Sequence, residues 1–362
     1  MKNTSSKLFI FLLSILFIGD MLDQVRAYSE VEKRPLASLP AWNLEALIDG
    51  SLTLDLENYI NDQFIGRDEW VRFKALLESS MGKKENNGIL LGKDGILFEK
   101  RLVLSDQAGL NLHYLSEFLE LYKTLPITVA LVPNKEAILK DALPTGFPML
   151  DSLEVLKSWR KTLPIADLSA QMLSHLDEKL YYDTDHHWTL RGAYLAYEQL
   201  MTLWGMTALP YESFGVQQID GFLGTLYNKS RFNGIKSETL SWIDPQILSY
   251  ETDGKVTGSL IDKAALTSKD PYSAFLYGNH GFGRIIVNNT IAPKKLLVIK
   301  DSYANSLIPF MTSAFDQIDV IDLRQFNGSL KGILETNEYD QILVLQSFNQ
   351  FCDEVNEAKL RY

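Results

Sequence analysis

From residue 110 onward, apolar residues follow two patterns in turn. Some segments repeat apolar residues at helical spacing, and others are short, continuous apolar runs rich in β-branched residues. The predicted helices span 110–122, 153–161, 170–179 and 330–336, with another after Ser302, and the predicted strands span 127–132, 165–167, 295–300, 318–322 and 341–345. This alternation is typical of an α/β layered fold with a mainly parallel sheet.

The pattern changes between residues 211 and 284. Gly, Ser and Asp become frequent there, and the apolar runs shorten to segments such as 240–243, 247–250, 274–277 and 285–287. Short strands separated by turn residues favour antiparallel pairing. We therefore expect an antiparallel insertion, or a set of long loops, within the α/β domain.

The segment that precedes the α/β domain has its own pattern. Residues 54–81 carry apolar positions at helical spacing, interrupted near Gly66. Two apolar runs then flank Lys93-Asp94-Gly95, a turn sequence typical of a β-hairpin. We expect a helical and hairpin region over residues 28–100, followed by the α/β domain over 101–362.

Residues 1–27 predict a targeting segment. Lys2 and Lys7 precede an apolar run from Leu8 to Ile18, and Val25-Arg26-Ala27 offers a small-residue cleavage pattern. The apolar run is short for a bilayer span. We favour a secretory signal peptide, with an uncleaved N-terminal membrane anchor as the alternative and a buried helix as the least favoured interpretation. Either of the first two makes the remaining chain extracytoplasmic, secreted or held at the outer face of the cytoplasmic membrane.

Composition narrows the functional classes. With 362 residues, 46% hydrophobic and 22% charged, the chain can bury a substantial core. A net charge of -11 and the lack of any Lys/Arg cluster argue against nucleic acid as the main partner. The single cysteine, Cys352, excludes an intramolecular disulfide and a zinc site built from thiolates.

Proton-transfer chemistry concentrates in residues 183–188, Asp-Thr-Asp-His-His-Trp. Only five histidines occur in the chain, and two of them are adjacent here. Thr189 can cap the helix that the following apolar spacing predicts, so we expect the cluster on a loop at a helix N-terminus. Asp185 and His187, two positions apart, can point the same way, which lets the carboxylate orient the imidazole.

Ser302 follows the predicted strand 295–300 at a strand-to-helix turn. Its hydroxyl would stand at the carboxyl edge of the sheet, where α/β folds bind ligands, beside backbone N–H groups able to stabilise an oxyanion. Serine is also common at helix starts simply as a cap, which is the structural alternative. The pair Asp185 and His187 supplies the carboxylate and base that a serine nucleophile requires.

Asp185-His186-His187-Trp188 resembles the signature of the DHHW protein family, which is similar to the alginate O-acetyltransferase branch of SGNH-hydrolase-like proteins. In that branch a D-x-H-W motif precedes the serine, a permuted order relative to ordinary SGNH hydrolases, and Ser302 follows the motif here. The hairpin and Asp301-Ser302-Tyr303 are also similar, whereas Glu32-Lys33-Arg34 departs from the family's Glu-Asn-Arg. The resemblance implies a three-layer SGNH-hydrolase-like α/β domain.

The resemblance also implies a catalytic role for individual residues. Asp185 would be the carboxylate of a triad, His187 the general base and Ser302 the nucleophile. The oxyanion donors would be Ser302 itself, the Gly278 N–H and the Asn279 side chain.

Three further residues are candidates for substrate contacts, namely Trp188, Tyr303 and Arg324. The alternative for Trp188 is a buried anchor of the loop, and for Arg324 it is a structural salt bridge. His186 and Asp183 are expected to be structural more than catalytic.

By this resemblance the chain would transfer acetyl groups to an extracytoplasmic polysaccharide through an acetyl-serine, with no cofactor and no metal. A membrane-bound O-acyltransferase would be the partner that supplies the acetyl group. Three alternatives stay open: a carbohydrate acetylesterase, a non-catalytic scaffold of a polysaccharide-modification complex, and a metal phosphoesterase, since carboxylates and imidazoles also bind divalent ions.

Overall fold

The computed structural model describes residues 2–29, 34–288 and 290–361, and it forms two compact units. The first comprises residues 1–87 with 227–234, and the second comprises 88–226 with 235–362. The first unit contains α1 (Lys2–Leu22), α2 (Leu44–Ile48), α3 (Ser51–Gln63), α4 (Arg67–Ser80), β1 (Tyr28–Ser29), β2 (Arg34–Pro35) and β3 (Glu85–Asn86). The expected interruption near Gly66 is confirmed, because the chain turns there with a positive φ of 65°.

The helix α1 covers most of the predicted targeting segment. Within the described residues, no helix combines the length and the apolar character that crossing a bilayer requires.

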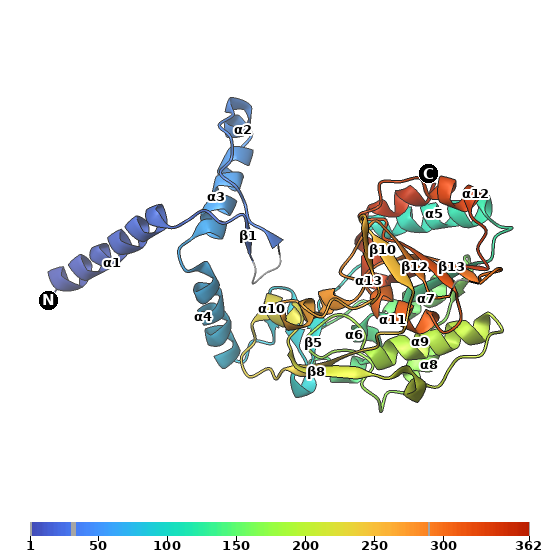
Figure 1. Cartoon of the computed structure of the whole chain (residues 1–362). Helices are drawn as coiled ribbons and strands as arrows, with labels where there is room; N and C mark the ends of the chain where they lie inside the picture. The colour runs from blue at the N-terminus through green and yellow to red at the C-terminus, as the bar shows by residue number, and fades with distance from the viewer. Residues whose placement is uncertain (1, 30–33, 289, 362) are drawn as a thin grey trace. The chain divides into compact units, whose positions relative to one another are not determined.

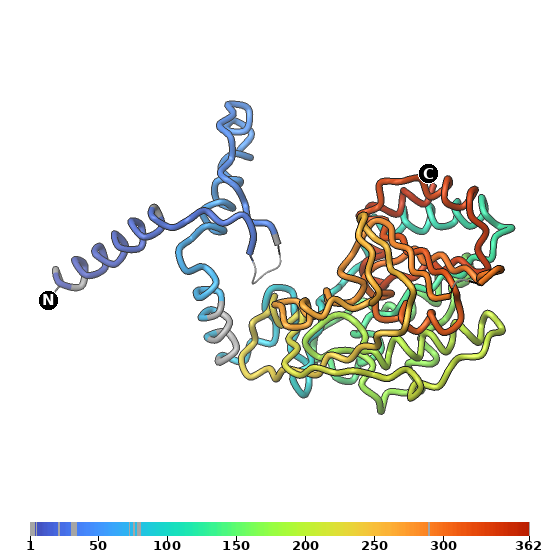
Figure 2. Tube along the Cα trace, viewed as in Figure 1, coloured from blue at the N-terminus to red at the C-terminus, as the bar shows by residue number. Residues whose placement is uncertain are grey.

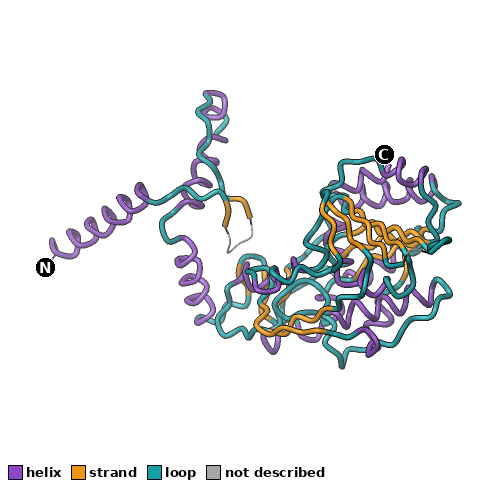
Figure 3. Tube along the Cα trace, in the orientation of Figure 1, coloured by secondary structure: helices purple, strands orange, loops and turns teal. Residues whose placement is uncertain are grey.

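The second unit is built on an eight-stranded mixed sheet (Figure 1, Figure 3). The strand order is β11-β10-β12-β14-β13-β15-β6-β7. The parallel strands are β6 (Ile127–Val132), β7 (Ile165–Ala166), β13 (Lys295–Lys300), β14 (Gln317–Ile321) and β15 (Gln341–Ser347). All five correspond to predicted apolar runs, and their carboxyl ends meet at one edge of the sheet.

Side chains of the central strands alternate between the two faces of the sheet, as the pleat requires. In β13, Leu296 and Val298 enter one core cluster, while Leu297 and Ile299 enter the other. Both faces are therefore apolar and each must be covered by helices.

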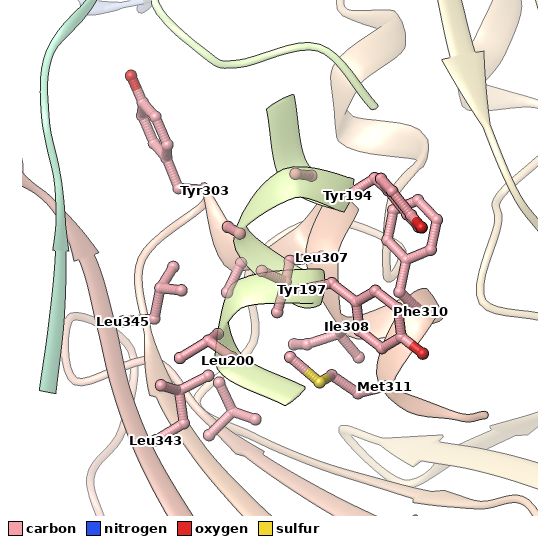
Figure 4. Packing of buried hydrophobic residues seen from close by; sticks show 14 of the residues in the cluster. Tyr194, Tyr197, Leu200, Tyr303, Leu307, Ile308, Phe310, Met311, Leu343 and Leu345 are labelled. Carbon is pink, nitrogen blue, oxygen red and sulfur yellow. The ribbon is translucent and has the colours of Figure 1, made fainter. Parts of the chain in front are cut away.

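One face is covered by α9 (Leu190–Leu203) and α11 (Ala304–Met311). Tyr194, Tyr197 and Leu200 of α9 pack with Leu307 and Phe310 of α11 above the sheet (Figure 4). The rings of Tyr197 and Phe310 stack with centroids 5.6 Å apart. This packing holds the two helix N-termini, and hence the loops that precede them, in one layer.

The opposite face is covered by α5 (Asp106–Leu121), α7 (Ser152–Trp159), α12 (Leu330–Thr336) and α13 (Phe348–Asp353). In Figure 2 the helix α5, in teal, runs beside the last residues of the chain, in red, although the two are far apart in sequence. The predicted three-layer α/β architecture is confirmed.

The segment 211–284 adds antiparallel strands, as predicted. β12 (Phe282–Ile286) pairs antiparallel with β14, and β10 (Ser249–Thr252) and β11 (Lys255–Thr257) continue the central sheet, each antiparallel to its neighbour. β8 (Gln217–Phe222) and β9 (Glu238–Trp242) form a separate antiparallel pair. The predicted hairpin is also present, with β4 (Ile89–Leu91) paired to β5 (Leu97–Glu99). The remaining helices are α6 (Lys135–Ile138), α8 (Ser169–Leu173) and α10 (Thr225–Ser230).

Two predicted elements were wrong. The helix expected over 170–179 ends at Leu173, because Ser174 and His175 side chains both bond the Gln171 carbonyl oxygen and the chain continues in tight turns. The strand expected over 274–277 is a turn, since Leu276 and Tyr277 both adopt positive φ values, 54° and 58°.

Candidate active site

The turn that carries Ser302 lies at the carboxyl edge of the sheet, between β13 and α11. The buried Asp301 carboxylate shapes this turn. It accepts hydrogen bonds from the Tyr303 N–H at 2.9 Å and from the Ser347 N–H at 2.7 Å, at the end of the neighbouring strand β15. The Ser302 hydroxyl is thus held on a turn fastened to two adjacent strands.

The loop that carries residues 183–188 ends at the N-terminus of α9. The Gly192 N–H donates to the Thr189 hydroxyl at 3.2 Å, which is the predicted helix cap. Trp188 is fully buried, and its indole N–H donates to the Tyr303 carbonyl oxygen at 3.0 Å and the Ser306 hydroxyl at 2.9 Å. The tryptophan therefore fastens the loop directly to the segment that carries Ser302.

The two loops bring Asp185, His187 and Ser302 together. The distance between His187 Nε2 and Ser302 Oγ is 2.8 Å, and that between His187 Nδ1 and Asp185 Oδ1 is 2.6 Å. With Nδ1–H donating to the carboxylate, Nε2 is left to accept the Ser302 proton. The aspartate and the histidine are only 1% and 5% exposed, so these contacts are shielded from water.

A second pair of donors fixes the Asp185 carboxylate. Its Oδ2 accepts hydrogen bonds from the Thr225 N–H at 2.7 Å and from the Thr225 hydroxyl at 2.9 Å. Burial by itself would raise the pKa of Asp185, but electrostatic attraction to the neighbouring His186 and His187 imidazoles and the hydrogen bonds hold that pKa well below its ordinary value. The carboxylate is therefore ionised throughout the neutral pH range.

Gly224 allows this close approach. A Cβ at that position would lie 2.7 Å from Asp185 Cα and closer still to the Asp185 side chain. Only glycine leaves room for the segment before Thr225 to pass over the carboxylate.

The buried Lys135 holds the backbone of the loop that carries residues 183–188. Lys135 follows β6, and its ammonium donates to the carbonyl oxygens of Tyr182 at 2.8 Å, Asp183 at 3.3 Å and Asp185 at 2.9 Å. Burial lowers the pKa of Lys135 to about 8, although nearby carboxylates oppose that shift.

From the other side, the Glu238 carboxylate accepts hydrogen bonds from the N–H groups of Asp183 and Thr184, at 2.8 and 2.7 Å. Lys135 thus binds carbonyl oxygens of the loop, and Glu238 binds its N–H groups. Sequence reasoning missed both residues. A lysine three residues after a buried strand was a usable signal for the first, and nothing in the sequence marked the second.

Tyr272 is another residue that sequence reasoning missed. Its ring stacks on the His187 imidazole with centroids 3.8 Å apart and planes at 12°. Its hydroxyl also lies 3.4 Å from the Ser302 carbonyl oxygen and 3.3 Å from the Ser306 hydroxyl. The stack restrains rotation of the imidazole about its χ angles.

Of the expected oxyanion donors, two are available and one is not. Among the described residues, neither the Ser302 N–H nor the Asn279 side-chain NH₂ donates to a protein acceptor. The Gly278 N–H, in contrast, donates to the Phe275 carbonyl oxygen at 3.0 Å. That expectation needs correction, because the turn at 276–278 uses this N–H internally.

Two of the three expected substrate contacts, Trp188 and Tyr303, also need correction. Trp188 and Tyr303 are buried, at 0% and 4% exposed, and the Tyr303 hydroxyl donates to the His186 carbonyl oxygen. Arg324 binds Asp322 through two hydrogen bonds, at 2.8 and 2.6 Å. The two aromatic rings therefore anchor the site from within, and the guanidinium forms the salt bridge that was the alternative.

The remaining polar residues of the motif have structural partners. His186 Nδ1 lies 2.7 Å from the Thr225 hydroxyl, and Asp183 accepts from the Lys179 ammonium at 2.7 Å. Ligand atoms of Asp185, His186 and His187 lie within 4.8 Å of one another, close enough for a metal ion. However, both Asp185 oxygens and both His187 ring nitrogens already have protein partners, which disfavours a metal site.

Comparison with known proteins places the chain among related families. Residues 162–321 match the model of the DHHW protein family. The resemblance to the DHHW family is confirmed. Residues 89–233 match a second family model, described as the SGNH hydrolase-like domain of the acetyltransferase AlgX. At the level of the family, this second match supports an acetyltransferase.

Solved structures show the same fold. A DHHW family protein from Eubacterium siraeum is 24% identical with a TM-score of 0.65, and the match covers 76% of this chain and 96% of that one. Bacillus cereus PatB1 is 21% identical with a TM-score of 0.61, covering 74% and 98%. Among curated protein sequences, none matches the chain.

Proposed function

We propose that this DHHW-type protein transfers acetyl groups to an extracytoplasmic polysaccharide through an acetyl-Ser302 intermediate. The observation that carries the proposal is the continuous chain of short contacts from Ser302 Oγ to His187 to Asp185, at 2.8 and 2.6 Å. A hydroxyl, an imidazole and a buried carboxylate in this order are the parts of a serine acyl-transfer triad.

In the first half-reaction, His187 Nε2 takes the Ser302 proton while Oγ forms a bond to the acetyl carbonyl carbon. The bond between that carbon and the donor's alcohol oxygen then breaks, and the leaving alcohol takes the proton from His187. Asp185, kept ionised, stabilises the imidazolium that exists between these two transfers.

In the second half-reaction, a sugar hydroxyl gives its proton to His187 and attacks the acetyl carbon. The bond to Ser302 Oγ breaks, and Oγ recovers the proton from His187. In both halves the carbonyl oxygen gains negative charge, and the Ser302 N–H and the Asn279 NH₂ stabilise it. The closing products are an acetylated sugar and the free enzyme.

We further propose that residues 1–27 direct the chain out of the cytoplasm, and that a membrane-bound O-acyltransferase supplies the acetyl group. The basic start and apolar run of that segment support the first point. The second rests on the resemblance to the alginate O-acetyltransferase branch; chemistry alone requires only that some acetyl donor be available outside the cytoplasm.

The test is acetyl partitioning between water and a sugar. The purified protein, without residues 1–27, is incubated with a chromogenic acetyl ester, with and without an oligosaccharide, and acetylated oligosaccharide and free acetate are measured. We expect the oligosaccharide to accelerate ester consumption and to carry the acetyl group, and the Ser302→Ala variant to do neither.

Fast hydrolysis that is unaffected by the acceptor would favour the acetylesterase. Full activity in the Ser302→Ala variant would refute the serine mechanism itself. The exposed Ser158, whose hydroxyl donates to the Val155 carbonyl oxygen in its own helix, provides a matched control as Ser158→Ala.

A further inference from the structure

The mechanism above leaves one buried charge near Ser302 unused. Lys300 ends β13, two residues before Ser302, and is 3% exposed. Burying an ammonium is costly unless hydrogen bonds compensate. Burial accordingly lowers the pKa of Lys300 to about 8, against the opposing charge of Asp322. A position this unfavourable calls for an explanation.

The shortest contact of this ammonium is to Asn279. Lys300 Nζ donates to Asn279 Oδ1 at 2.8 Å, and its contact with Asp322 Oδ2 is longer, at 3.4 Å. Asp322 is already paired with Arg324, which binds it with two hydrogen bonds. The Asp322 carboxylate thus shares its charge with two cations, while the amide oxygen of Asn279 receives the better Lys300 bond.

This contact determines which way the Asn279 amide faces. The oxygen and nitrogen of an amide are interchangeable in shape, but an ammonium has only donors, so the atom facing Lys300 must be the oxygen. The Asn305 NH₂ donates to the same oxygen at 3.2 Å. The Asn279 NH₂ is therefore directed away from both donors, on the exposed side of the residue.

Asn305, which donates to the Asn279 amide oxygen, also connects this amide to the turn that carries Ser302. Asn305 lies in the first turn of α11, and its N–H donates to the Ser302 carbonyl oxygen at 3.2 Å. Hydrogen bonds also reinforce one another when they are in series, so a cation on the amide oxygen makes the amide N–H groups stronger donors.

We propose that Lys300 is a positioning residue whose ammonium orients the Asn279 amide, and strengthens its NH₂ as a donor, toward the oxyanion that forms on Ser302. The inference deepens the proposed function and depends on it. Lys300 does not touch the substrate and acts only through Asn279.

The test is a double-mutant cycle read on kcat for acetyl ester turnover. The Asn279→Ala variant loses the donor itself, and removal of one oxyanion donor costs about 10²–10³-fold in kcat. The Lys300→Met variant keeps the length of the side chain but loses the ammonium, and we expect about a tenfold loss in kcat, with KM unchanged.

The double variant should be no slower than Asn279→Ala alone, because Lys300 has nothing left to orient. A Lys300→Met loss that multiplies fully with the Asn279→Ala loss, or a wild-type kcat in Lys300→Met, would overturn the inference. If Ser302→Ala retains activity instead, the proposed function fails first, so the two failures are distinguishable.

A second variant keeps the test decisive if Lys300→Met does not fold. Asn279 is exposed, and Asn279→Asp retains an oxygen for Lys300 while offering no donor to the oxyanion. We expect it to be as slow as Asn279→Ala, and a wild-type kcat would contradict the oriented-amide account. Lys359→Met is the matched control, since Lys359 donates to the Leu323 and Phe326 carbonyl oxygens and has no part in the mechanism, and its kcat should match the wild type.

Discussion

Replacement of Gly224 by alanine tests how tightly the Asp185 carboxylate must be held. The added Cβ would lie 2.7 Å from Asp185 Cα, whereas ordinary van der Waals contact begins at 3.4 Å. The two segments must therefore separate by about 0.7 Å at that atom, and by more at the carboxylate. The movement also lengthens both hydrogen bonds that Thr225 donates to Asp185.

The magnitude follows from two estimates. Overpacking of this kind costs about 1–3 kcal/mol, which a domain with about 5–15 kcal/mol of stability survives. A displacement near 1 Å at a catalytic group costs about 10²-fold in rate. We thus expect Gly224→Ala to remain folded and to lose about 10²-fold in kcat. This loss is smaller than the ~10⁴-fold loss in kcat that an Asp→Asn change causes in a serine triad.

The assay is acetyl ester turnover, with thermal unfolding measured on the same samples. Gly258 provides the control, because a Cβ there meets nothing within 4 Å and its φ is not positive, so Gly258→Ala should match the wild type. A folded Gly224→Ala variant with wild-type kcat would refute the idea that the position of Asp185 limits the reaction.

Three further predictions follow from the site and from the core. Tyr272→Leu, which removes the ring stacked on His187, should lower kcat by up to about tenfold, whereas Tyr272→Phe keeps the ring and should lose about twofold; equal losses would contradict a stacking role. Burial raises the pKa of Glu357 from 4.5 to about 8, so the unfolded chain releases this proton at lower pH than the folded protein, and the stability that the protonated carboxyl contributes is lost as the pH rises from about 4.5 to about 8. Glu357→Gln should therefore raise the free energy of unfolding by up to about 3 kcal/mol at pH 8 and by less at pH 5, and thermal unfolding at the two pH values checks this. A difference that does not depend on pH would contradict the burial argument. A chelator should leave ester turnover unchanged, because the Asp185 oxygens already accept protein hydrogen bonds; loss of turnover that added Zn²⁺ restores would favour the metal phosphoesterase.

Much of the fold could be predicted because the central strands are buried on both faces. Runs such as 129–132 and 296–299 are continuously apolar, and this property is visible in the sequence without tertiary information. The segment 274–277 was misjudged because its apolar residues are buried in a turn, and left-handed backbone at Leu276 and Tyr277 leaves no trace in an apolar pattern.

The site was partly predictable for a different reason. Asp185 and His187 are neighbours in sequence, and Ser302 follows a recognisable strand, so topology brings them to one edge. Tyr272 and Lys135 reach His187 and its loop from distant segments, through contacts that only the folded chain creates. The sequence also could not show whether the expected substrate contacts are exposed. A tryptophan at position 188 is compatible with a surface that stacks on a sugar and with a buried anchor.

The central claim is that Ser302 carries the acetyl group. The most direct measurement is to mix the protein with an excess of acetyl ester, quench with acid within the first turnovers, and sequence the digested peptides by mass spectrometry. We expect one acetyl group on Ser302 in the wild type, and we expect it to disappear when an oligosaccharide acceptor is added. No acetyl group should accumulate in His187→Ala or in Ser302→Ala. Turnover without any acetyl group on Ser302, or with the group on another residue, would contradict it.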